Sequence, residues 1–143
     1  MAMWRAGHRS VYELDEWQQV DGFARLLHEV CGELDLGRDK EWLVYLLEQA
    51  GRLMRGAVEE SWHREYLAEF ILGLSEALTF LALIDYYLVF LRHEGYLPVV
   101  RAQEVTGRLS AVQHALAALA GRLREALRAG PAGPLSVSPW SRN

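Results

Sequence analysis

The 143-residue sequence contains one cysteine and one lysine, and it lacks the apolar and polar alternation that strands produce. Cys31 cannot form a disulfide within the chain, which excludes a secreted fold held together by bridges and favours a reducing cytoplasm. No segment alternates over six residues between turn residues, so the sequence predicts an all-α protein. Residues 1–21 do not contain a basic segment followed by an apolar stretch and a small-residue cleavage site, so we expect no secretory signal.

Sequence motifs for catalysis, cofactors and metals are also missing. Neither a phosphate-binding glycine loop nor the G-x-S-x-G motif of hydrolases occurs. A di-metal helical bundle needs two Glu-x-x-His spacings, and only Glu60 with His63 provides one. His28 precedes Cys31 by three residues, a pairing that can activate a thiolate, but Cys31 lies on an apolar stripe where a buried, inert cysteine is favoured. We therefore expect no enzyme, no cofactor and no metal site.

Helix-breaking residues divide the chain into four long segments. The breaks fall at residues 36–38, at Ser61, at residues 95–98 and at residues 130–131. The predicted helices cover about residues 15–34, 39–60, 62–93 and 98–129. Short connections make consecutive helices neighbours, so the prediction is an antiparallel up-down-up-down four-helix bundle over residues 1–129. Residues 130–143 form a Pro-, Gly- and Ser-rich tail, from which Trp140 can dock onto a neighbour.

Particular residues are expected at the helix ends. Asp39 and Ser61 are candidate caps for the second and third segments, because their side chains can accept hydrogen bonds from the free amides of a first turn. Gly95 is expected to end the third segment in a left-handed conformation, and Gly130 to end the fourth. These residues define the predicted helix boundaries.

The second segment carries an apolar stripe that includes Trp42, Leu46 and Leu53, interrupted by Gly51 and Gly56. Each glycine costs about 1 kcal/mol of helix propensity relative to alanine. We therefore expect the two glycines to permit a close helix contact or a bend.

The third segment has more apolar surface than one stripe requires. Residues 66–91 hold only three charged side chains, Glu69, Glu76 and Asp85, so a membrane span has to be weighed. We reject it, because each carboxylate would cost about 2.5–3.5 kcal/mol at mid-membrane and no basic flank offsets them. A bundle buries one stripe per helix, so the second apolar side indicates an oligomer; a wide core helix in a monomer is the alternative. The predicted oligomer interface contains Leu72, Phe80, Leu83, Tyr87 and Phe90.

Charge is unevenly distributed along the chain. The net charge of −4 and the pI near 5.7 argue against a surface that binds nucleic acid throughout. Residues 59–92 hold six acidic and two basic side chains, whereas residues 93–143 hold six arginines and three glutamates. The arginines of the fourth helix can meet phosphates, although a solvated helix face is the alternative because no aromatic residues interleave them. The candidate nucleic-acid-binding residues are Arg101, Arg108, Arg122, Arg124 and Arg128.

Several short motifs carry a family resemblance. They are Tyr12-x-Leu14-x-x-Trp17, Gln49-Ala50, Glu65-Tyr66-Leu67, the pair Gly73 and Ser75, and Gly95-Tyr96-Leu97. Over about residues 12–128 this pattern resembles the four-helix-bundle family named for proteins encoded in 23S rRNA intervening sequences. The same superfamily includes the accessory variability determinant of diversity-generating retroelements.

The resemblance implies a pentameric barrel of bundles that binds nucleic acid and a reverse transcriptase. We therefore expect a non-enzymatic cytoplasmic accessory protein, an oligomer of five subunits, with RNA or DNA and a reverse transcriptase as partners and no membrane association. The alternative is a protein-interaction scaffold without a nucleic-acid role, which binds a protein through its acidic outer face and Trp140.

Overall fold

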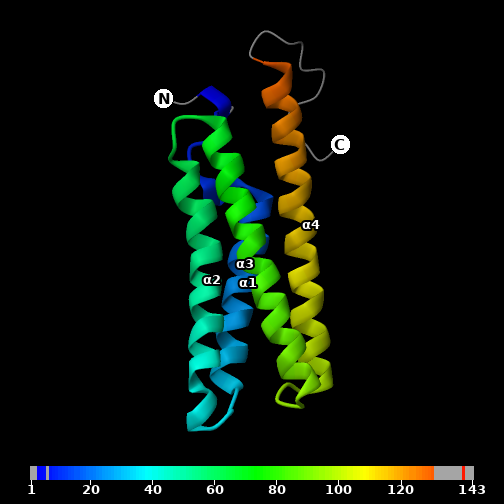
Figure 1. The fold of residues 1–143 in the computed structure, drawn as a ribbon. Coiled ribbons are helices and arrows are strands. Elements are labelled where there is room, and N and C mark those ends of the chain that lie inside the picture. Colours follow the sequence, from blue (N-terminus) through cyan, green and yellow to red (C-terminus); the bar gives the residue numbers. More distant parts are fainter. Residues whose placement is uncertain (1–2, 6, 131–139, 141–143) are drawn as a thin grey trace.

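The computed structural model describes residues 3–5, 7–130 and 140, and these contain four long helices and three short 3-10 helices (Figure 1). No strand occurs in these residues, and the predicted all-α four-helix bundle is confirmed. Of the predicted tail, only Gly130 and Trp140 lie within the described residues. The elements are η1 (Met3–Arg5), η2 (Val11–Glu13), α1 (Asp15–Glu33), η3 (Arg38–Lys40), α2 (Glu41–Trp62), α3 (Leu67–His93) and α4 (Val99–Ala129).

The four helices enclose one elongated core. Helix α1 packs against α2 and α4, and α3 packs against the same two helices. Successive helices run in opposite directions in Figure 1, so the end of α2, the start of α3 and the end of α4 lie at one end of the bundle. Burial of a large apolar side chain stabilises a fold by about 1.5–3 kcal/mol, which makes the inner side of α3 a main source of stability. The wholly buried side chains on that side are Phe70, Leu74, Ala77, Leu81, Ile84, Leu88 and Leu91.

The boundary between α2 and α3 differs from the prediction, because Ser61 does not cap a helix. Helix α2 continues through Ser61 to Trp62, and α3 begins only at Leu67. The Ser61 hydroxyl is buried and donates to the carbonyl oxygen of Val58 at 3.1 Å, within its own helix. The two additional residues of α2 include Trp62, whose side chain is completely buried. A helix cap contributes about 1 kcal/mol, less than the burial of a large aromatic ring, so packing determines where this helix ends.

Asp39 is not a cap either. It lies within η3, and α2 begins at Glu41 without a side-chain cap. The neighbouring Lys40 instead donates from Nζ to the hydroxyl of Tyr96 at 2.7 Å, which links the connection between α1 and α2 to the connection between α3 and α4. This hydrogen bond raises the pKa of Lys40 above its usual value. At the other helix ends, Gly95 (φ 78°) has the positive φ that the sequence predicts. Gly130 (φ 71°, ψ 170°) ends α4 as predicted and also has a positive φ, with an extended ψ.

Close helix contact occurs at two glycines. A Cβ added to Gly51 would lie 3.1 Å from Cδ2 of Leu27 on α1, which confirms the close-contact interpretation for this residue. Gly56 has open space around it. The tightest contact is at Gly73 of α3, where an added Cβ would collide with the Ser61 side chain and lie 2.8 Å from the carbonyl oxygen of Ala57.

An aromatic cluster closes the end of the bundle at which α2 ends. Trp62 makes edge-to-face contacts with Trp4, Phe70 and Trp140 at ring-centroid distances of 5.3, 5.3 and 5.7 Å. Trp140 therefore docks onto its own chain, and its Nε1 donates to the carbonyl oxygen of Trp4 at 3.2 Å. Arg5 donates from Nε to the carbonyl oxygen of Trp62 at 2.7 Å, which satisfies a carbonyl group that a helix end leaves free.

Cys31 is buried, as expected for an inert thiol, and this burial predicts slow alkylation. Burial, assisted by the negative charge of Glu48, raises the pKa of the Cys31 thiol to about 12. Because the thiolate is the reactive form, we expect iodoacetamide at mildly alkaline pH to modify the folded protein at least about a hundredfold more slowly than the protein in denaturant. Mass spectrometry of the modified chain over time measures both rates. Equal rates would show that the thiol is accessible in the folded state.

Candidate functional site

The most conspicuous surface feature is a strip of apolar side chains along α3. Leu72, Leu83, Tyr86 and Phe90 are exposed, with Tyr86 71% and Leu72 60% accessible. They recur at spacings that place them on one side of the helix, opposite its core side. The exposed set includes three of the five predicted interface residues, whereas the other two, Phe80 and Tyr87, are half-buried against the core. Tyr86 was not predicted as part of the interface.

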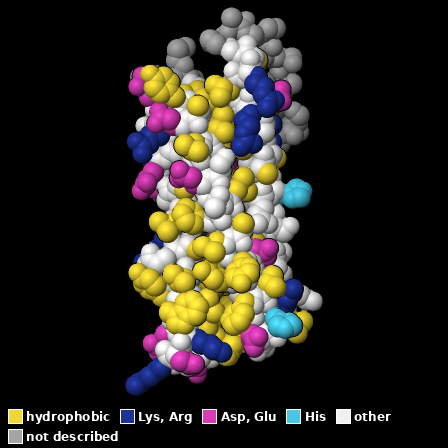
Figure 2. Space-filling view, viewed as in Figure 1, with side chains coloured by type: hydrophobic (Ala, Val, Ile, Leu, Met, Phe, Trp, Pro, Cys, Tyr) yellow, Lys and Arg dark blue, Asp and Glu magenta, His cyan; other side chains and the backbone are white. Residues whose placement is uncertain are grey.

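Helix α2 extends this apolar strip. Trp42, Leu46 and Leu53 project from the outer side of α2, and Trp42 is 58% exposed. The apolar stripe predicted for this segment contains these three residues together with residues that the structure buries. We define the apolar face by seven of the exposed apolar residues of the two helices. Figure 2 shows apolar side chains gathered over α2 and α3 on the side of the bundle that Figure 1 presents. The apolar face consists of Trp42, Leu46, Leu53, Leu72, Leu83, Tyr86 and Phe90.

An acidic groove borders the apolar face where α2 ends and α3 begins. Carboxylates from both helices line this groove of about 300 Å³, together with Leu72 and Arg64. We define the acidic groove by its three carboxylate residues, Glu60, Glu69 and Glu76. The close contact of Gly73 with Ser61 lies within it and brings the two helices together there. The groove therefore combines a local negative charge with an adjoining apolar surface.

Two of the five predicted phosphate-binding arginines form ion pairs with α1. Arg101 lies 2.8 Å from a carboxylate oxygen of Glu33 and 2.9 Å from one of Glu104. These hydrogen bonds raise the pKa of Arg101 above its ordinary value. Arg122 lies 3.3 Å from Oε2 of Glu16, a carboxylate that is buried at the start of α1. Both arginines therefore neutralise carboxylates of the bundle itself.

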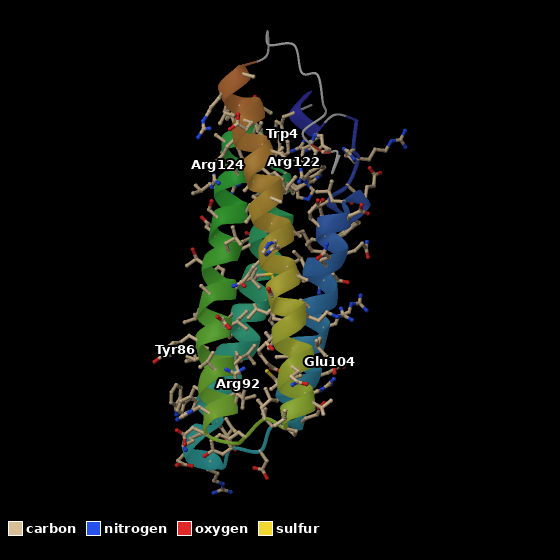
Figure 3. The ribbon with its side chains drawn as sticks, turned by 90° about the vertical axis from the view of Figure 1, so that its right-hand side faces the viewer. Trp4, Tyr86, Arg92, Glu104, Arg122 and Arg124 are labelled. Carbon is tan, nitrogen blue, oxygen red and sulfur yellow. The ribbon has the colours of Figure 1, made fainter. Side chains whose placement is uncertain are left out.

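Of the remaining arginines, Arg108 follows Arg101 by seven residues and shares the α1-facing side of α4 with Arg101 and Arg122, whereas Arg124 and Arg128 lie on another side of the helix. Arg108 lies beside Gly22 of α1. Arg124 is on the other side of α4, where Nη2 donates to the Ser75 hydroxyl of α3 at 3.1 Å. Arg128 is exposed and lies 3.0 Å from a carboxylate oxygen of Glu125. Figure 3 shows Arg122 and Arg124 on different sides of α4, with Arg124 projecting toward the same side of the bundle as Tyr86.

Metal coordination has no candidate site in the part of the chain that the structure describes. No group of three or more His, Cys, Asp or Glu side chains there is arranged to hold a metal ion. Glu60, part of the one Glu-x-x-His spacing, lines the acidic groove, and His63 follows the last residue of α2.

Helix α3 is long and apolar enough to cross a bilayer by length and composition, with a mean hydropathy of 1.9 over its most apolar 18-residue window. Within that window 39% of the residues are buried inside the bundle. The core helix of a soluble protein has the same composition, because one side of it fills the core.

The geometry of the described residues defines an all-α four-helix bundle with an exposed apolar face on α2 and α3. In comparisons with known proteins, neither a protein-family model nor a curated protein matches the sequence. The fold and the surface of the chain therefore carry the functional argument.

Proposed function

We propose that this protein is a non-enzymatic, cytoplasmic scaffold that self-associates through its apolar face. The supporting observation is the exposure of seven large apolar side chains on two adjacent helices. Contiguous apolar patches of this kind on proteins in water mark interaction sites, because leaving them hydrated is unfavourable. The family resemblance adds a subunit number, and we propose a ring of five copies.

A second copy of the chain fits the apolar face better than a lipid bilayer does. Glu76 follows Leu72 by four residues and precedes Leu83 by seven, so it lies on the same exposed side of α3 as these two leucines. Glu69 lies seven residues before Glu76, on the same side of the helix. Carboxylates are unfavourable in hydrocarbon but are readily paired or hydrated at a protein interface. The core side of α3 already packs within the bundle, so only its outer side needs a partner.

The mass of the particle in solution tests this proposal. We expect light scattering at micromolar concentration to give several times the chain mass of 16.3 kDa, and five times this mass for the proposed ring. The double variant Leu83→Arg/Tyr86→Arg is expected to be a single chain, because it places two charges within the apolar face. Val100→Arg is the matched control, since Val100 is equally apolar and exposed but lies on α4. A wild-type mass of one chain would overturn the proposal.

Nucleic-acid binding is the second candidate function, and the position of Arg124 and Arg128 favours it. Both side chains are exposed near the end of α4, and a ring would repeat them around its axis. We propose RNA or DNA, together with a reverse transcriptase, as the partners in this case. The ion pairs of Arg101 and Arg122 with the bundle make these two residues weaker candidates.

Salt-dependent retention of a nucleic-acid probe distinguishes the two functions. We expect the variant Arg124→Glu/Arg128→Glu to release an RNA or single-stranded DNA probe at low salt if the arginines bind phosphate. Arg122 is left unchanged, since its replacement would leave the buried carboxylate of Glu16 without its ion pair. Wild-type protein that retains no probe at low salt would exclude this second function, and recovery of one specific protein after nuclease treatment would support the scaffold alone.

A further inference from the structure

We infer that the copies associate in parallel, with the acidic groove of one copy binding Arg124 and Arg128 of the next. This inference rests on the proposed self-association and specifies its polarity and its contact residues. The inference follows from the sign and the position of the charges on either side of the apolar face.

The acidic groove and the two arginines lie at the same height along the bundle. The contact of Gly73 with Ser61 places the groove at the start of α3, on the side of α2. The hydrogen bond from Arg124 to Ser75 places the arginines beside the same turns of α3, on the side of α4. Leu72 lies exposed in this part of α3 and lines the groove. In Figure 2 the charged side chains at this end are mainly acidic on the α2 side and mainly basic over α4, with apolar side chains between them.

Rotational symmetry would bring the acidic groove of one copy into contact with the arginines of the next. A rotation about an axis parallel to the helices keeps every residue at its height and brings the α2 side of one copy against the α4 side of the next. Glu69 and Glu76 of one copy then face Arg124 and Arg128 of its neighbour, while the apolar faces of all copies turn toward the common axis. Charges of opposite sign at matching positions select this partner and this orientation.

An antiparallel arrangement lacks this complementarity. It would place the acidic groove of one copy at the other end of its partner, where Trp42, Tyr86 and Phe90 form the apolar face. Carboxylates would then lose water against aromatic rings without gaining an opposite charge, which is unfavourable. The same charges therefore favour the parallel contact and disfavour the antiparallel one.

Charge reversal tests the inferred pairing. The variants Glu69→Arg/Glu76→Arg and Arg124→Glu/Arg128→Glu each place like charges across the contact. We expect each to weaken self-association at least about tenfold, measured by sedimentation velocity over a dilution series. The quadruple variant carries both reversals, restores opposite charges in every contact and is expected to regain the wild-type mass. Circular dichroism checks that each variant is folded.

A matched control and three outcomes separate this inference from the proposed function. Arg38→Glu/Arg52→Glu changes the net charge equally at two exposed residues outside the contact and is expected to leave the mass unchanged. If Leu83→Arg/Tyr86→Arg dissociates the assembly but the charge reversals do not, self-association stands and the inferred pairing is wrong. A quadruple variant that stays dissociated also overturns the pairing. A wild-type protein that is a single chain overturns both.

Discussion

Replacing Trp62 with alanine is expected to lower the free energy of unfolding by about 3–5 kcal/mol, the range measured for large aromatic residues in protein cores. Its ring is wholly buried and makes edge-to-face contacts with Trp4, Phe70 and Trp140. The loss combines the hydration of apolar surface, an unfilled cavity and the contacts of three rings. Chemical denaturation followed by far-UV circular dichroism measures the change without depending on tryptophan fluorescence.

Tyr45→Ala provides the control for Trp62→Ala. Tyr45 lies on the same helix, but the residue is 61% exposed and has little packing to lose. We expect its replacement to change the free energy of unfolding by less than about 0.5 kcal/mol. Similar losses for the two variants would contradict the central position of Trp62 in the aromatic cluster.

Gly73→Ala is the second substitution with a large expected effect, and it should destabilise the protein by about 1–3 kcal/mol. Alanine would raise the intrinsic helix propensity of α3 by about 1 kcal/mol. Its Cβ, however, would collide with Ser61 and lie 2.8 Å from the carbonyl oxygen of Ala57, so α2 and α3 would have to separate. The steric cost is therefore expected to exceed the gain in propensity, and the midpoint of urea unfolding should fall.

Gly56→Ala makes the same chemical change in a different environment. No atom outside the adjoining backbone of its own helix and its chain neighbours lies within 4 Å of a Cβ added at Gly56. Only the difference in helix propensity between glycine and alanine therefore acts, and we expect a gain of about 0.5–1 kcal/mol. The two glycine variants should therefore shift the unfolding midpoint in opposite directions. A shift in the same direction for both would show that the contact between Gly73 and Ser61 does not limit the approach of α2 and α3.

The sequence predicts the four helices well, and it predicts the ends of α3 and α4 because these two ends depend on local chemistry. Gly95 and Gly130 follow these helices with a positive φ, which glycine adopts without steric cost. The predicted helix start at Ser61 is wrong, because the preference of serine for a capping position competes with the burial of the neighbouring Trp62. Trp62 packs against residues distant in sequence, such as Trp4. Local propensity is a weak guide when a large aromatic ring can reach the core.

The candidate site is less predictable because it depends on which helix lies beside which. The surplus apolar surface of α3 is visible in the sequence, but the exposure of Trp42 and Leu53 follows only from the angle at which α2 packs. The ion pairs of the arginines also depend on which helices are neighbours. Nothing local indicates that Arg101 meets Glu33, 68 residues earlier, or that Arg124 lies on the other side of α4.

The single lysine makes subunit orientation measurable by chemical crosslinking. Lys40 is held by Tyr96 at the end of the bundle opposite the acidic groove, about 30 Å away along a helix of this length. An amine-specific reagent thus finds one side-chain anchor per subunit. Parallel neighbours would bring these anchors to the same end, within reach of a short spacer, whereas antiparallel neighbours would separate them by the length of the bundle.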